Sequence, residues 1–214
     1  METTRIIPLH EVIVARDMSY EIFLHTNFGE KRVEWVNGVV IDMGSVTKIH
    51  NAITRFLIAF FEDFLSLTTG GEVFHDPMVM HSRPDLPGRA PDVQVVLPEN
   101  VHIIGENDVA GPADLVVEVV SPESIQRDHV DKRREYQKGG VKEYWVIDPL
   151  EREIIFYQRN AHGIFETIQP DEQGVYHSKV LMGLSIPADL FWRDTLPRGV
   201  EITEMVKGML KPSS

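Results

Sequence analysis

The stretch from residue 112 to residue 149 constrains the fold of this chain more than any other. Residues 114–120 form a run of leucine and valine broken by two acids, which is typical of a strand buried on both faces. Serine and proline then begin a predicted helix over residues 122–138, and two glycines end it. Residues 143–148 predict a second buried strand. Such a crossover unit makes its two strands parallel.

Acidic residues interrupt the first of these strands. Alternation along a strand puts Asp114 and Glu118 on one face, inside what should be core. Burying an unpaired carboxylate costs roughly several kcal/mol, so each needs a cation, a metal ion or strong hydrogen bonds. On the following helix, Asp128, Lys132 and Tyr136 are spaced four residues apart and share one face. This combination of buried acids and a nearby lysine indicates a functional site.

The composition favours a single domain of cytoplasmic type. The chain has 214 residues, 43% of them apolar, and no internal linker rich in glycine, serine or proline. We expect an N-terminal extension at residues 1–17, a domain at 18–192 and a C-terminal tail at 193–214. There are no cysteines, which excludes a disulfide framework and a zinc site with cysteine ligands. No signal core or membrane span is expected, so we predict no membrane partner.

The net charge of −12 argues against a nucleic-acid partner without excluding it, because basic residues can be concentrated locally. Lys132, Arg133, Arg134 and Lys138 all belong to the predicted helix at residues 122–138. Such a run is either a solvated helix face or part of a binding surface, and the sequence leaves both readings open.

Periodicity and turn signals predict the remaining elements. They are a short helix at residues 19–24, a hairpin at 32–43 that turns at Asn37-Gly38, a helix at 50–67, strands at 72–81, 90–97, 153–159 and 164–168, an edge strand at 175–185, a short helix at 187–192 and weak helical character at 202–210. The strand at 90–97 should neighbour the strand at 114–120 in antiparallel orientation.

Three polar residues in these elements are candidates for the site. Asp92 stands at the start of its strand, so antiparallel pairing brings it beside Glu118. Glu34 interrupts a hairpin strand and reads as an exposed rung of the sheet. His50 begins a helix, where it contacts an anion or, as we rather expect, is a capping or surface histidine.

Asp92 and Glu118 together predict a metal site. Two carboxylates from neighbouring strands can hold Mg²⁺ or Mn²⁺ and leave room for water and a phosphate. The ion would activate a water and stabilise charge on the phosphate, and Lys132 would orient that water. The alternatives are strand-end carboxylates bonded to backbone, and a Lys132–Asp128 surface pair worth about 0.3–0.5 kcal/mol.

These residues resemble the PD-(D/E)XK nuclease superfamily, and in particular the "Uma" family of putative restriction endonucleases. The matching positions are Glu34 and Gly38, His50, residues 90–93, residues 112–122, the series Asp128, Lys132 and Tyr136, and residues 140–149. The resemblance covers about residues 18–192. It implies an α/β fold with a restriction-endonuclease-like central mixed sheet flanked by helices, and an active site where two strands diverge.

The chain departs from the superfamily pattern at one position. The residue two after Glu118 should be lysine, but Val120 stands there. Lys132 is the candidate replacement and Lys142 the second choice. Glu34 resembles an acid that the family brings towards the site, and Asp114 either supports the site or caps the strand entrance.

The leading hypothesis is therefore a Mg²⁺-dependent DNA endonuclease with Asp92, Glu118 and Lys132 as catalytic residues, supported by Glu34, Asp114, Asp128, Tyr136 and His50. A homodimer is compatible with cutting two strands. A non-catalytic interaction module on the same scaffold is the alternative, because fold does not fix function. A third option is hydrolysis of another phosphoester.

Overall fold

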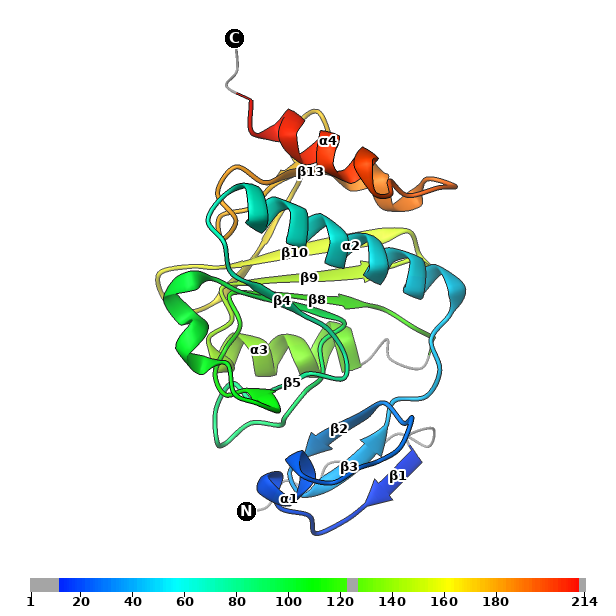
Figure 1. Cartoon of the computed structure of the whole chain (residues 1–214), viewed down its shortest axis with the longest axis vertical. Coiled ribbons are helices and arrows are strands. Elements are labelled where there is room, and N and C mark those ends of the chain that lie inside the picture. Colours follow the sequence, from blue (N-terminus) through cyan, green and yellow to red (C-terminus); the bar gives the residue numbers. More distant parts are fainter. Residues whose placement is uncertain (1–11, 123–126, 212–214) are drawn as a thin grey trace.

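A mixed six-stranded sheet forms the centre of the protein (Figure 1). The computed structural model describes residues 12–122 and 127–211. The strand order is β11-β10-β9-β8-β6-β4, and among these described strands β8 and β9 are the parallel neighbours. The strands are β4 (Glu72–Phe74), β6 (Val93–Val96), β8 (Leu115–Val119), β9 (Glu143–Asp148), β10 (Glu153–Arg159) and β11 (Phe165–Ile168). The predicted mixed α/β class is confirmed.

The predicted crossover unit joins β8 to β9, whose strands are parallel as expected. A π-helical turn, η2 (Arg127–Lys132), leads directly into α3 (Arg133–Gly139). Gly140 ends this helix in the left-handed conformation with φ 107°, which a residue without Cβ adopts at little cost. The helix start expected after residue 121 falls partly on residues 123–126, which lie outside the described chain.

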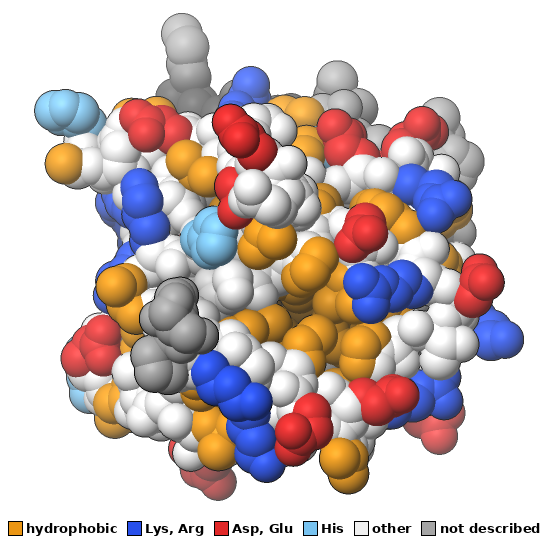
Figure 2. Space-filling model, turned by 90° about the horizontal axis from the view of Figure 1, so that it is seen from above, with side chains coloured by type: hydrophobic (Ala, Val, Ile, Leu, Met, Phe, Trp, Pro, Cys, Tyr) orange, Lys and Arg blue, Asp and Glu red, His pale blue; other side chains and the backbone are white. Residues whose placement is uncertain are grey.

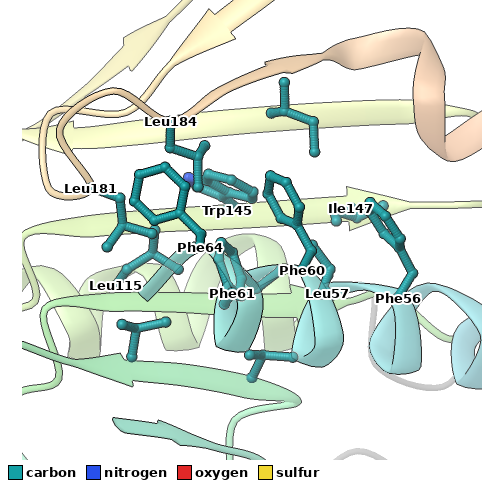
Figure 3. Close-up of a cluster of buried hydrophobic side chains, with 14 of the residues drawn as sticks. Phe56, Leu57, Phe60, Phe61, Phe64, Leu115, Trp145, Ile147, Leu181 and Leu184 are labelled. Carbon is teal, nitrogen blue, oxygen red and sulfur yellow. The ribbon is translucent and has the colours of Figure 1, made fainter. Parts of the chain in front are cut away.

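One face of the sheet is covered by α2 (Lys48–Leu67), whose cap is Thr47. Its aromatic and leucine side chains point into the core against the sheet (Figure 3). The labelled partners are Phe56, Leu57, Phe60, Phe61 and Phe64 of α2 with Leu115, Trp145, Ile147, Leu181 and Leu184. On the outer side of α2 lies α4 (Val200–Met209), which buries Ile202 and Val206 in the same cluster. Part of the expected tail therefore belongs to this core.

The other face of the sheet carries α3 and a second apolar cluster. Val116 and Val120 lie in this cluster with Tyr136 of α3 and Tyr144 of β9. Glu118 shares their side of the strand, because alternate residues point the same way. The acidic residue of β8 is thus held between the sheet and α3.

A separate three-stranded sheet packs at the end of the molecule that holds the catalytic candidates. It consists of β1 (Val12–Ala15), β2 (Val33–Val36) and β3 (Val39–Asp42), with α1 (Tyr20–Leu24) beside it. Asn37 and Gly38 have φ values of 50° and 86°, so they form the predicted tight hairpin turn. The hairpin delivers Arg32 and Glu34 towards the central sheet.

Two predicted strands differ from the structure. The run at residues 72–81 is divided into β4 and β5 (Val79–Met80) by a turn around Pro77. The run at 175–185 forms a two-stranded ribbon of β12 (Val175–His177) and β13 (Ser185–Pro187), because a turn separates its ends. The other short elements are β7 (Asp108–Val109) and the 3₁₀ helices η1 (Pro98–Ile103) and η3 (Ala188–Trp192). No helix in the described chain has the length and apolarity to cross a bilayer.

Candidate active site

The pairing of β6 with β8 brings Asp92 and Glu118 to the same end of the central sheet. The two strands are antiparallel, with Val93 opposite Val117, so Asp92 precedes its strand where Glu118 approaches the end of its own. Both side chains are buried, and both line one small cavity of about 20 Å³. That volume has room for a single water or ion rather than a substrate.

Asp92 is held by three hydrogen-bond donors. Its Oδ2 accepts a hydrogen bond from the backbone amide of Val119 at 2.8 Å and lies 3.1 Å from Nε2 of His50. Its Oδ1 accepts from Nη2 of Arg32 at 3.3 Å. Burial raises the pKa of Asp92, but His50, Lys132 and the Val119 amide together lower it below its usual value, so the carboxylate stays ionised.

His50 is therefore not the surface histidine that we expected. Its backbone amide is capped by the Thr47 hydroxyl, and its ring is buried against Asp92. The first turn of α2 turns this ring inward because Ile53 and Phe56, further along the helix, face the core. The start of α2 therefore places His50, one of the expected supporting residues, against Asp92.

Glu118 is bound at both oxygens. Its Oε1 accepts a hydrogen bond from the Tyr136 hydroxyl at 2.6 Å, and its Oε2 lies 2.9 Å from Nζ of Lys132. Burial raises the pKa of Glu118 to about 8, against the opposing effect of Lys132. Neighbouring carboxylates raise this pKa further, those of Asp128, Asp92 and Glu34.

Lys132 is the centre of a buried ion cluster. Besides Glu118, its ammonium lies 3.3 Å from Glu34 Oε1 and 3.3 Å from Asp128 Oδ1. Burial lowers the pKa of Lys132, but these three carboxylates raise it well above its usual value. The side chain is only 3% exposed, so the alternative of a surface pair with Asp128 is wrong.

Glu34 lies beside Lys132 and is not an exposed rung of the sheet. It is 1% exposed, with its carboxylate between Lys132 and Arg89. Arg89 Nη1 donates to Glu34 Oε2 at 2.7 Å, and the same guanidinium binds both oxygens of Glu135 on α3. This bidentate pair joins the loop, the hairpin and the helix around Lys132.

Sequence reasoning missed Arg32 and Arg89. Arg32 pairs with Asp76 and Asp92 at the rim of the cavity. Arg89 lies in a stretch with loop composition, where a buried guanidinium is not expected. The signal in the sequence was the position of each arginine. Arg32 begins the hairpin that contains Glu34. Arg89 directly precedes residues 90–93, which contain Asp92.

Asp114 lies at the opposite end of β8 from this cluster. It accepts hydrogen bonds from the Leu97 amide at 2.8 Å and from Asn100 at 2.7 Å, and Lys142 pairs with it at 2.6 Å. Asp114 therefore caps the start of β8, which is one of the two roles expected from the sequence. The same contact removes Lys142 as a source of the ammonium beside Glu118.

The donor set fits a divalent cation that takes few protein ligands. Across residues 12–122 and 127–211, no three His, Asp or Glu side chains converge as a complete metal cage. Mg²⁺, however, is held in many enzymes by one or two carboxylates, with waters and substrate phosphate completing its shell. Asp92 and Glu118 are two such carboxylates that line one cavity. Burial first, and then the neighbouring carboxylates, raise the pKa of Glu118, and a cation would offset the charge of those neighbours.

Comparisons with known proteins identify the family and the fold of the chain. A model of the Uma2 family, described as "Putative restriction endonuclease", matches residues 20–189. A solved structure described as a putative nuclease belonging to DUF820, from Anabaena variabilis ATCC 29413, is similar with a TM-score of 0.63 and 16% identity. The match covers 87% of this chain and 97% of that one, and at this identity it shows the shared fold. No curated protein matches the chain. Because the family model spans most of the sequence, the chain belongs to the Uma2 family of putative restriction endonucleases.

Proposed function

We propose that this protein is a DNA endonuclease that hydrolyses phosphodiester bonds with the help of Mg²⁺ or Mn²⁺. The observation that carries the proposal is the buried contact of Lys132 with Glu118 beside Asp92. Buried charges of this kind are costly to keep, and strongly shifted pKa values in a cleft are typical of catalytic sites. The nuclease description of the family supports the same reaction class.

Asp92 and Glu118 are the residues that would hold the cation. The Val119 amide, His50 and Arg32 fix the Asp92 carboxylate, and Tyr136 fixes that of Glu118. When bound, the ion offsets the charge that develops on the phosphate and lowers the pKa of the attacking water. Such pre-oriented ligands need little rearrangement during the reaction.

Lys132 acts as a fixed positive charge and hydrogen-bond donor. Its raised pKa keeps the ammonium protonated at any working pH, so it does not serve as a general base. Its remaining role is to orient the attacking water and to stabilise negative charge on the phosphate. Burial strengthens this interaction, because the surrounding medium screens it poorly.

Arg32 is suited to meet the phosphate from the rim. It is partly exposed, it lines the cavity, and its guanidinium already faces the Asp92 carboxylate. A guanidinium forms paired hydrogen bonds with phosphate oxygens. The small cavity admits only an ion or a water, so the scissile bond would lie at its mouth beside Arg32.

The proposal is tested by a matched pair of variants. Wild-type protein is incubated with supercoiled plasmid and Mg²⁺ or Mn²⁺, and compared with Glu118→Gln and with Glu62→Gln, an exposed glutamate of α2. We expect cleavage by the wild type and by Glu62→Gln, and none by Glu118→Gln. The melting temperature should rise with Mn²⁺ in the first two proteins and not in the third.

Two outcomes would overturn the assignment. Cleavage that persists in Glu118→Gln would come from a contaminating nuclease. A wild type with neither cleavage nor a Mn²⁺-dependent melting shift would instead be a non-catalytic module on a nuclease scaffold. A double-strand cut also needs two sites, so we propose a homodimer, measured by light scattering in the presence of DNA.

A further inference from the structure

A wide groove lies next to the candidate active site. It has a volume of about 990 Å³ and runs between the first half of α2 and the chain at residues 191–199. Figure 2 views the molecule from the side of α4 and shows a hollow lined by hydrophobic side chains, with Lys and Arg side chains at its margin. None of the contacts in the active site uses this groove.

The charge of the groove is opposite to that of the protein. Lys48, Arg55, Arg152, Arg193 and Arg198 line it, whereas Asp194 is the acid among the described lining residues. The whole chain carries a net charge of −12. Within the described chain, Lys48 and Arg55 have no carboxylate partner, so their charges are directed to solvent. The groove therefore attracts an anion that the rest of the surface repels.

Its floor is apolar and aromatic. Phe56 and Phe191 lie beneath it, and Trp192 is half-buried in its wall. The Trp192 backbone carbonyl accepts a hydrogen bond from Arg152, which fixes the two residues relative to each other. An inorganic anion would leave this floor uncovered, so the natural occupant has a flat apolar part as well as negative charge.

The groove and the catalytic cavity are lined by neighbouring residues at the start of α2. Thr47, Lys48 and Ile49 line the groove, and the adjacent Val46 and His50 line the cavity with Asp92. In Figure 1 the tip of the β8 arrow, the beginning of α2 and the loop before α4 lie at the same side of the molecule. A chain-like ligand bound in the groove could therefore extend to the mouth of the cavity.

We infer that the groove binds an unpaired stretch of the nucleic-acid substrate, a deepening that rests on the proposed nuclease function. Bases of a single strand can stack on Trp192 and cover the apolar floor while the phosphates meet Lys48 and Arg55. A duplex keeps the faces of its bases stacked inside, so it offers no free base face to the aromatic floor of the groove. The substrate class is thus DNA with a single-stranded segment next to the scissile phosphate.

Binding is measured under conditions that prevent cleavage. The result then tests binding in the groove independently of the proposed nuclease activity. A fluorescein-labelled oligothymidylate of about 12 nucleotides is titrated with the whole protein in EDTA, beside a blunt duplex of equal length. We expect the single strand to bind more tightly and its affinity to fall with salt. The double variant Lys48→Glu/Arg55→Glu should bind it roughly tenfold or more weakly. Lys207→Glu/Lys211→Glu, with the same charge change on exposed residues at the far end of α4, should bind as the wild type does.

Intrinsic fluorescence reports the stacking step. Of the three tryptophans, Trp145 is buried and Trp35 of β2 donates a hydrogen bond to the Met18 carbonyl, so Trp192 is the one in the groove. Oligothymidylate should quench the wild type and not Trp192→Phe. Equal binding of duplex and single strand, equal affinity of the two double variants, or displacement by heparin as readily as by unlabelled oligonucleotide would overturn the inference. Binding as expected in a protein that never cleaves would overturn only the nuclease assignment.

Discussion

The ammonium of Lys132 lies 2.9 Å from Oε2 of Glu118, although the helix rather than the strand supplies it. The position two after Glu118 holds Val120, which is buried in the apolar cluster beneath α3. The π-helical turn at Arg127–Lys132 widens the helix where it delivers the lysine, and such turns are frequent at functional sites. An ammonium therefore reaches Glu118 from the element that follows β8.

Replacing Lys132 by methionine should abolish this arrangement. We expect Lys132→Met to lower the cleavage rate by about 10²-fold or more, a typical effect of removing a charge-stabilising donor. It should also destabilise the fold by about 3–5 kcal/mol, because Glu118, Glu34 and Asp128 lose their shared cation. Single-turnover kinetics and thermal unfolding measure the two effects.

The control for this change lies on the same helix. Lys138 is exposed and pairs with Asp85 at the surface, so Lys138→Met should keep both the cleavage rate and the melting temperature nearly unchanged. Circular dichroism shows whether Lys132→Met remains folded at the assay temperature. A folded Lys132→Met that cleaves at the wild-type rate would contradict the role assigned to the ammonium.

Tyr136→Phe tests how firmly Glu118 must be held. The change removes a hydroxyl that donates to Glu118 Oε1 at 2.6 Å and leaves the packed ring in place. We expect a loss of stability of about 1–3 kcal/mol, since a buried carboxylate oxygen loses its donor. The cleavage rate should fall much less than in Lys132→Met. The matched control is Tyr144→Phe, whose hydroxyl donates to the Asp128 carbonyl instead.

Local patterns predicted the elements around the site well. The turn at Asn37-Gly38 and the apolar stripe of α2 depend on neighbouring residues, so the sequence contains their full signal. The crossover from β8 to β9 follows from the same local signals together with a general rule of topology. The Asp92–Glu118 proximity then follows from strand pairing.

The ion cluster could not be predicted in the same way. Burial of Glu34 depends on how the small sheet packs against the central one, and a hairpin pattern does not encode that contact. Arg89 lies in a loop, and its partners Glu34 and Glu135 are distant in sequence. From the sequence, His50 is only a residue at the start of a helix, and the fold turns its ring towards Asp92.

Glu34 should contribute stability that acid removes. Burial raises the pKa of Glu34, but the opposite effect of Lys132 and Arg89 is larger and lowers the pKa to about 2. Because the folded pKa lies below the unfolded value, the ionised form stabilises the native state above about pH 4.5, and this contribution is lost as the pH falls towards 2. We therefore expect Glu34→Gln to be less stable than wild type at neutral pH.

Urea unfolding at a series of pH values measures this difference. The gap between wild type and Glu34→Gln should shrink as the pH falls from about 4.5 towards 2, because the wild-type carboxylate also becomes neutral. Glu62→Gln, at an exposed position of α2, should show no comparable gap at any pH. A wild-type advantage that stays constant down to pH 2 would show that Glu34 contributes through shape rather than charge.

Arg89→Met should show how much the ion pairs of Arg89 stabilise the fold around the site. Arg89 is 1% exposed and binds Glu34 and Glu135 without lining the cavity. Its loss removes the ion pair of the half-buried Glu135 and one ion pair of the buried Glu34, which should cost about 3–5 kcal/mol and lower the melting temperature by about 10 °C. Arg134→Met, a change at an exposed residue on the same helix as Glu135, should leave the free energy of unfolding and the melting temperature nearly unchanged.

Adding Glu34→Gln to Arg89→Met should recover part of the lost stability, because the uncompensated charge is then removed. If the double variant is instead less stable by the sum of both changes, the two residues do not act as a pair.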